Sequence, residues 1–351
     1  MSSYVSASHL SQLPESFQDA PSTWAWISYS NPSVAVLPGA FNRSAMQAPL
    51  EGQIQDKTIA KEWNFLNTTD FIAYDERFFD IIGPKAQVQH IETLAYQTHE
   101  APCYISKTKQ YLCDTETETL SKIQTDPPTY NAHGCVVYKD ELYVVTDGYG
   151  SNETGQLVKI DSTTWKREIV LNNYHGQPFL GFNDLDIDSD GNFWSTDSKS
   201  AYGRGLIDFY YPTNPTVYFV NATTMRPRPV HITTGNANGV AVALNQDTIL
   251  LATAYDASNS GGVLSNPRLL NNPISYFYDG IRASRSGLLF AGAGDGVDVI
   301  DPVDGSTLGI IRVGGGENLA VSMTFGKHDL WIVGRGGLWK VSNIAERLDR
   351  K

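Results

Sequence analysis

The sequence has no run of basic residues and little charge of either sign. Only 18% of its 351 residues are charged, and 38 acidic residues against 26 basic ones give a net charge of −12. Ordinary soluble chains are about 25% charged. Because binding to phosphates requires clustered Lys and Arg, this balance argues against a nucleic-acid partner.

Long hydrophobic runs are also missing. No stretch of 18 or more apolar residues occurs, so we expect no membrane-spanning segment. The first residues lack a basic region followed by an apolar run, so no secretory signal is visible, although a mature chain preceded by Met would begin in the same way. Sequons at Asn42, Asn67, Asn152 and Asn221 favour the secretory pathway over the cytoplasm.

Cysteine is scarce, with Cys103, Cys113 and Cys135 as its only occurrences. Three cysteines allow at most one disulfide within the chain. Buried free thiols explain the same residues equally well. Both alternatives stay open at the level of sequence.

Aromatic and turn-forming residues are abundant by comparison. The chain is 41% hydrophobic and 11% aromatic, and it contains 30 Gly and 17 Pro. This composition excludes a disordered chain and a long helical bundle. Helical periodicity is limited to one stretch, residues 342–350, where we expect a C-terminal helix.

Six segments share one pattern, in which a polar residue precedes an apolar strand, a turn and a second strand. These polar residues, which we call the anchors, are Glu100, His133, Asn183, Asn238, Asp279 and Asn318. Successive anchors are about 44 residues apart on average, and four-stranded propeller blades repeat at about 40–50 residues. The sequence therefore predicts an all-β fold, a six-bladed β-propeller.

The repeat also predicts the domain boundaries. Residues 71–351 form the propeller, and residues 1–70 form an N-terminal extension packed on it because they stand outside the repeat. We expect a strand within 71–97 to complete the last blade and close the ring, since an open propeller would expose an edge.

The anchors begin the innermost strands, so we expect them to converge on the central channel. Carboxylates at Glu100 and Asp279, with amide oxygens from the Asn anchors, suit a hard divalent cation such as Ca²⁺. The alternative is that polar residues begin these strands only to solvate the channel.

Several short motifs fall on this repeat in order. They are residues 74–83 (YDERFFDIIG), 99–101 (HEA), 171–174 (LNNY), 182–184 (FND), 237–239 (ANG) and 279–280 (DG). Together they resemble the SMP-30/gluconolactonase/LRE-like family, and within it the fungal lactonohydrolases. The resemblance covers most of the chain, from about residue 70 to residue 336.

The resemblance implies a metal-dependent hydrolase that opens a lactone ring. Its metal ligands would be Glu100, Asn183, Asn238 and Asp279, with Ca²⁺ as the first choice and Mg²⁺, Zn²⁺ or Mn²⁺ as alternatives. The carboxylate of Asp279 would also be the catalytic general base. The partner of such an enzyme is a small-molecule substrate, and the oligomeric state is left open.

The second anchor departs from the family pattern, because fungal relatives have Asn-Gly where this chain has His133-Gly134. His133 could contact substrate or move a proton as a catalytic residue, or it could be only a buried channel histidine. We also expect Asn318, Phe182 and Tyr278 to bind substrate.

The loops at 148–156, 199–216 and 255–273 are rich in Tyr and Phe, which favours an aromatic or apolar lactone over a simple sugar lactone. His133 keeps a second function open, a non-hydrolytic enzyme of fungal secondary metabolism that catalyses a dehydration or a cyclisation such as a hetero-Diels–Alder reaction. A binding propeller without chemistry is the third hypothesis.

One further motif is set aside. Residues 186–191 (DIDSDG) resemble the start of an EF-hand loop, but strands rather than helices flank them. The sequence predicts a tight hairpin turn there instead.

Overall fold

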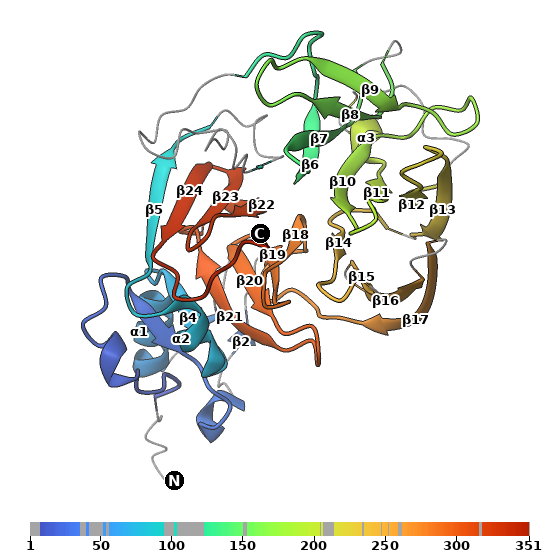
Figure 1. The fold of residues 1–351 in the computed structure, drawn as a ribbon. Coiled ribbons are helices and arrows are strands. Elements are labelled where there is room, and N and C mark those ends of the chain that lie inside the picture. The colour runs from blue at the N-terminus through green and yellow to red at the C-terminus, as the bar shows by residue number, and fades with distance from the viewer. Residues whose placement is uncertain are drawn as a thin grey trace.

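Most of the chain folds into antiparallel sheets that stand around a central axis, as blades of a β-propeller (Figure 1). The computed structural model describes residues 8–35, 40–41, 52–53, 56–94, 102–103, 123–149, 153–203, 205, 214–233, 235–246, 248–251, 253–258, 262–315 and 318–350. Within these residues the all-β prediction is confirmed.

Each blade places its first strand innermost. The first two blades are β6 (Ala132–Tyr138), β7 (Glu141–Thr146), β8 (Gln156–Ile160) and β9 (Arg167–Leu171), then β10 (Phe182–Ile187), β11 (Phe193–Asp197), β12 (Thr216–Val220) and β13 (Pro227–Ile232). The third is β14 (Ala241–Val242), β15 (Thr248–Leu250), β16 (Thr253–Ser258) and β17 (Val263–Leu269). The fourth is β18 (Ile281–Ala283), β19 (Leu289–Gly292), β20 (Gly296–Ile300) and β21 (Thr307–Arg312). The fifth is β22 (Leu319–Phe325), β23 (Leu330–Arg335), β24 (Gly337–Ser342) and β5 (Gln87–Glu92).

The number of blades differs from the prediction. The described residues form five blades where the sequence predicts six. Five of the six predicted segments coincide with the hairpins that begin these blades. The remaining segment, which begins at Glu100, lies outside the described residues except for Pro102 and Cys103.

The turn between β10 and β11 shows why these hairpins form. The Asp188 carboxylate accepts the backbone N–H groups of Asp190 (3.1 Å) and Asn192 (2.9 Å). Gly191 takes a φ of +87°, which glycine adopts without steric cost. The predicted hairpin turn is confirmed.

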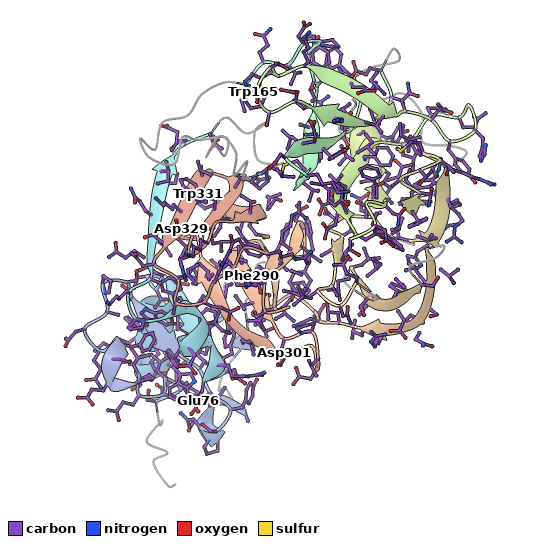
Figure 2. The ribbon with its side chains drawn as sticks, viewed as in Figure 1. Glu76, Trp165, Phe290, Asp301, Asp329 and Trp331 are labelled. Carbon is purple, nitrogen blue, oxygen red and sulfur yellow. A yellow bond between two sulfur atoms is a disulfide. The ribbon has the colours of Figure 1, made fainter. Side chains whose placement is uncertain are left out.

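Aromatic and aliphatic side chains fill the space between neighbouring blades. Phe290 of β19 and Trp331 of β23 are both almost completely buried (Figure 2). The Phe290 ring packs edge-on against Phe325 of β22, with 5.1 Å between centroids. Each such burial stabilises the fold by about 1.5–3 kcal/mol, so contacts between blades hold the ring together.

The last blade is completed by a strand from the N-terminal part of the chain. β5 pairs antiparallel with β24, and Leu338 lies opposite Glu92. This arrangement confirms that a strand within 71–97 completes the last blade.

The N-terminal extension contains helices that the sequence pattern did not reveal. Among described elements, these are the 3-10 helices η1 (Glu15–Phe17) and η2 (Pro32–Ala35) and the α-helix α1 (Lys57–Leu66). Two further helices lie outside the extension: α2 (Arg77–Ile82), and α3 (Ser200–Gly203) between β11 and β12 of the second blade. The Asp56 side chain caps α1 by accepting N–H groups of Thr58 and Ile59. None of the described helices has the length and hydropathy needed to cross a membrane.

The extension is joined to the fourth blade. β1 (Trp24–Trp26) runs parallel to β4 (Phe71–Ala73), and β4 pairs with β21. The short strands β2 (Ala40–Phe41) and β3 (Gly52–Gln53) form a separate pair. A strand inside the predicted extension therefore belongs to a propeller sheet.

Residues 343–350, the C-terminal arm, are not helical, so the predicted C-terminal helix is wrong. Leu348 accepts the N–H of Arg285 and donates its own N–H to the Lys327 carbonyl, both at 2.9 Å. The Arg350 guanidinium donates to the carbonyl of Ala283, the last residue of β18 (2.8 Å). These bonds to other segments replace those that a helix would make internally, and the chain ends near the centre of the ring (Figure 1).

Cys103 and Cys135 form a disulfide, which decides between the alternatives for these two residues. Cys135 lies on β6, so the bridge ties the chain just after Glu100 to an inner strand. Cys113 lies outside the described residues.

Candidate active site at the channel mouth

The described anchors sit at equivalent places of consecutive inner strands. His133 lies in β6 and Asn183 in β10, while Asn238, Asp279 and Asn318 stand one to three residues before β14, β18 and β22. Glu100 lies outside the described residues. All five described anchors therefore lie at the same end of the channel, which we call its mouth.

Glycines after the anchors let neighbouring inner strands approach closely. The Gly239 N–H donates to the Asp279 carbonyl (3.0 Å), and a Cβ on Gly239 would lie only 2.2 Å from that oxygen. The Gly280 N–H donates in the same way to Val321 (2.8 Å). This contact between backbones brings Asn238 and Asp279 next to each other.

The donor atoms at the mouth fit a hard cation. Asn238 Oδ1 is buried and has no hydrogen-bond partner among the described residues. Asn183 is buried and Asp279 is half-buried. In the described part of the chain no three His, Cys, Asp or Glu side chains cluster, so amide oxygens would be needed as ligands. Amide and carboxylate oxygens are the ligands that Ca²⁺ accepts.

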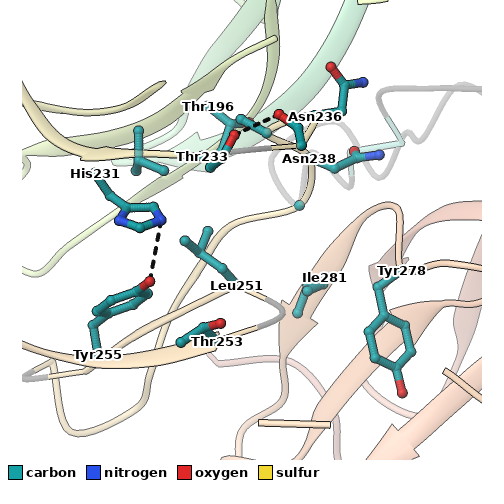
Figure 3. A pocket seen from close by; sticks show the side chains of 14 residues that line it. Thr196, His231, Thr233, Asn236, Asn238, Leu251, Thr253, Tyr255, Tyr278 and Ile281 are labelled. Atoms are coloured by element: carbon teal, nitrogen blue, oxygen red, sulfur yellow. Dashed lines mark hydrogen bonds between the residues drawn. The ribbon is translucent and has the colours of Figure 1, made fainter. Parts of the chain in front are cut away.

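Two cavities open at the segment 276–279. One, of about 250 Å³, is lined by Asn238 and Tyr278 among others (Figure 3). The other, of about 150 Å³, is lined by Asp279 and Arg335. Space for a substrate therefore lies next to both predicted ligands.

His133 is held by a carboxylate that the sequence analysis did not identify. His133 Nε2 lies 3.0 Å from Oδ2 of Asp147, and both side chains are buried. Asp147 directly follows β7, the second strand of the same blade. A carboxylate at this distance favours the tautomer with the proton on Nε2 and fixes the orientation of the ring.

Asp147 is one of three buried aspartates near the ends of second strands. Asp197 accepts hydrogen bonds from the backbone N–H groups of Leu180 and Gly181. Asp295 forms a bidentate ion pair with Arg312. Burial raises the pKa of Asp197 to about 7, against the opposing effect of those two hydrogen bonds. The repeated Thr-Asp at 146–147 and 196–197 is a sequence signal that could have identified Asp147 and Asp197, whereas Asp295 follows a glycine.

An ion pair connects two inner strands just beyond the anchors. Arg282 of β18 donates to both carboxylate oxygens of Asp184 of β10, at 2.8 and 2.9 Å. Asp184 also accepts the N–H of Val240, which precedes the intervening strand β14. The two blades are therefore tied together beside the predicted metal ligands.

A family model decides the relationship of the chain to known proteins. The model of the SMP-30/gluconolactonase/LRE-like region matches residues 78–333. The chain belongs to this family. The family resemblance that the motifs predict is thereby confirmed, and the match spans the described blade hairpins from β6 into β23.

Relatives within the family carry names of lactone hydrolases. Lactonohydrolase oryL of Aspergillus oryzae is 26% identical, over 94% of this chain and 90% of its own length. Lactonohydrolase oryH of the same fungus is 22% identical, over 76% of this chain and 79% of its own. These names lend no support to the cyclisation hypothesis.

Solved structures of the family share the fold. A gluconolactonase from Xanthomonas campestris superposes with a TM-score of 0.62 at 19% identity, covering 77% of this chain and 93% of its own. A calcium-binding regucalcin from Agrobacterium tumefaciens gives a TM-score of 0.56 at 12% identity, covering 75% and 96%. At these identities the likeness establishes the propeller alone.

The residues expected to bind substrate occupy different environments in this family member. Tyr278 lines the larger cavity and donates its hydroxyl to Asp298 (3.1 Å), and the Asn318 amide donates to the Val313 carbonyl (3.1 Å). Phe182 is fully buried, 4.5 Å from the Phe179 ring, and lines neither cavity. The expectation for Phe182 receives no support, because its side chain belongs to the core between blades.

Proposed function

We propose that this protein is a metal-dependent hydrolase that opens the ring of a small lactone. The observation that carries the proposal is the buried, unpaired Oδ1 of Asn238 beside the carboxylate-bearing Asp279 at the channel mouth. The relatives named lactonohydrolases and gluconolactonases support the choice of lactones as substrates.

Glu100, Asn183, Asn238 and Asp279 would hold the cation, with Ca²⁺ as the first choice. A divalent cation supplies Lewis-acid polarisation of a carbonyl oxygen when it is bound. The regucalcin neighbour, which is described as calcium-binding, supports this choice of ion.

Side chains of the protein carry out the two proton transfers of the reaction. Asp279 accepts a proton from the attacking water, and the carbon–oxygen bond of the lactone ring then breaks. His133 passes a proton to the departing ring oxygen, and Asp147 stabilises the charged imidazole during that transfer. Asn318 and Tyr278 orient the substrate, an aromatic or apolar lactone.

The disulfide supports an oxidising compartment for this protein. Bridges persist in oxidising compartments and are rare in the cytosol. The Cys103–Cys135 bridge and the sequons therefore support a secreted protein or one of the secretory pathway.

Metal removal tests the proposed function. The metal-loaded protein is assayed on a panel of lactones that includes γ-butyrolactone, dihydrocoumarin and gluconolactone, and at least one of them should be hydrolysed. Chelation with EDTA should lower the rate at least about 100-fold, and added Ca²⁺ should restore it. Activity that survives complete removal of the metal would overturn the metal-dependent mechanism.

Two variants separate metal binding from proton transfer. Asn238→Ala should weaken Ca²⁺ binding in calorimetry at least about tenfold, whereas Asn64→Ala on the exposed face of α1 should not change it. Asp147→Asn should leave Ca²⁺ binding intact, lower kcat/KM about 10²-fold, and move the alkaline limb of its pH profile to lower pH, because His133 must be protonated to act as the acid. An unchanged pH profile in Asp147→Asn would remove His133 and Asp147 from the mechanism.

A further inference from the structure

The larger cavity at the mouth continues outward between two neighbouring blades (Figure 3). Asn238 lines its inner end, and His231 of the outermost strand β13 lines its outer end. Val217 of β12 and Leu251 and Tyr255 of the next blade contribute to its walls. The cavity therefore leads from a predicted metal ligand to the outer part of the ring.

No charged side chain lines this cavity among the described residues. Burial lowers the pKa of His231, which favours its neutral imidazole. A carboxylate, phosphate or ammonium group entering the cavity would lose its hydration without gaining a countercharge, which disfavours its binding. The lining selects for an uncharged group.

The outer end of the cavity offers hydrogen bonds. His231 Nε2 and the Tyr255 hydroxyl lie 3.3 Å apart, and Figure 3 shows the two rings facing each other at that end. The Thr233 hydroxyl donates a hydrogen bond to the Gly235 carbonyl (2.8 Å), so its oxygen can still accept a hydrogen bond from another donor. A neutral group that donates and accepts hydrogen bonds would be matched there.

The entrance is held in place before any ligand arrives. The Asn236 side-chain oxygen accepts the Ser198 hydroxyl (3.0 Å) and the Lys199 N–H (3.2 Å). These bonds fasten the loop that carries Asn238 to the neighbouring blade. A preformed entrance reduces the ordering cost of binding.

We propose that this cavity, the side-arm subsite, receives an uncharged substituent of the lactone that ends in a hydroxyl or carbonyl group. Its volume equals that of about eight water molecules at about 30 Å³ each, which sets the length of the arm to about eight heavy atoms. The lactone ring then lies at the mouth, and Tyr255 and His231 bind the far end of the arm. This assignment rests on the proposed lactone hydrolysis and adds the substrate class.

Three γ-lactones that differ only in their arm test the subsite. The arms are hexyl, 6-hydroxyhexyl and 5-carboxypentyl, and kcat/KM is measured for each with Ca²⁺ present. The hydroxylated arm should exceed the hexyl arm about 5- to 10-fold and the carboxylated arm at least about 100-fold. Equal or better turnover of the carboxylated lactone would overturn the proposal.

A matched pair of variants localises the effect. Tyr255→Phe should reduce the preference for hydroxyhexyl over hexyl at least about fivefold, because the hydroxyl that binds the arm is gone. Tyr143→Phe, which removes a tyrosine hydroxyl in another blade, should keep the wild-type preference. An unchanged preference in Tyr255→Phe would place the arm elsewhere.

Binding measurements separate this proposal from the proposed function. If all three lactones are inert, the proposed hydrolysis fails, and the corresponding lactams are then titrated by calorimetry. The hydroxyhexyl lactam should bind at least about tenfold more tightly than the carboxypentyl lactam, with the difference reduced in Tyr255→Phe. Equal affinities would overturn the side-arm subsite independently of catalysis.

Discussion

Asp298 shows how one buried carboxyl group makes the stability of the folded protein depend on pH. Burial raises the pKa of Asp298 to about 7, and the hydrogen bond from the Tyr278 hydroxyl opposes this rise only in part. The folded protein therefore keeps a proton on Asp298 at pH values where the unfolded chain, with a pKa near 3.9, has lost it.

The consequence for stability has a definite sign. Between about pH 4 and pH 7 the native state binds more protons than the unfolded state, so the free energy of unfolding falls as the pH rises. Over pH 5 to 7.5 this group alone should account for a loss of about 2 kcal/mol. Asp298→Asn removes the titration, and urea denaturation at the two pH values should show a smaller decline in the variant.

An exposed acid provides the control for that measurement. Glu168→Gln on β9 should keep the wild-type pH dependence of the unfolding free energy, because that side chain is exposed. Identical pH dependence in Asp298→Asn and the wild type would contradict the assignment.

At the same scale, the anchors could be predicted from sequence and their partners could not. A polar residue before an apolar strand is visible in the chain, so His133, Asn183, Asn238 and Asp279 were identified without coordinates. Asp147 reaches His133 through a register shift between Ala132 and Cys135 in the pairing of β6 with β7. A bulge of this kind has no reliable signature in one sequence.

Among the elements, the Cys103–Cys135 disulfide gives the clearest test. The bridge closes a loop over a sequence separation of 32 residues, and chain-entropy arguments give about 3–4 kcal/mol for such a loop. The double variant Cys103→Ser/Cys135→Ser should therefore unfold at a lower urea concentration, measured in EDTA so that metal does not contribute.

Reduction provides the matched comparison for the disulfide. Wild-type protein treated with a phosphine reductant should resemble the double variant, and the double variant itself should not respond to the reductant. Because Glu100 precedes Cys103 by three residues, the midpoint of a Ca²⁺ titration should also rise on reduction if Glu100 is a ligand. Equal urea midpoints with and without the bridge would contradict a stabilising role.

Secondary-structure elements could be predicted from the sequence where their hydrogen bonds join residues close together in the chain. The β10–β11 hairpin closes within its own few residues, so its Asp and Gly pattern was sufficient. Helix α1 also carried a local signal that was overlooked, the Asp56 cap with buried Ile59 and Trp63 four residues apart. The C-terminal arm carried no local signal, because its hydrogen bonds join it to carbonyl groups of segments far away in the sequence.

For the whole molecule, Arg350 joins three blades from the end of the chain. Its guanidinium donates to the carbonyls of Val242 and Ala283 and lies 3.8 Å from the Asp186 carboxylate. Arg350→Ala should therefore lower the free energy of unfolding by about 2 kcal/mol, the magnitude expected for hydrogen bonds to a charged group. Equilibrium denaturation in urea measures the change.

The neighbouring arginine of the C-terminal arm supplies the control. Arg347 forms a partly exposed ion pair with Asp349, two residues away. Arg347→Ala should change stability much less, since such surface pairs contribute little. Equal losses in the two variants would mean that the arm is not anchored through Arg350.

The overall architecture was predictable because the same hairpin recurs along the chain. The blade count was not confirmed, since the described residues form five blades. The fastening of the extension through β1 and β4 depends on pairing between distant segments, which one sequence does not reveal.

The pairing of β5 with β24 has a consequence for the order of synthesis. Residues 87–92 leave the ribosome long before residues 337–342, and yet they belong to the same sheet. At a synthesis rate of about 5–20 residues per second, β24 is completed at least about ten seconds after β5. During translation the last blade therefore stays incomplete, with an edge strand that a chaperone or another nascent chain could reach until the final residues emerge.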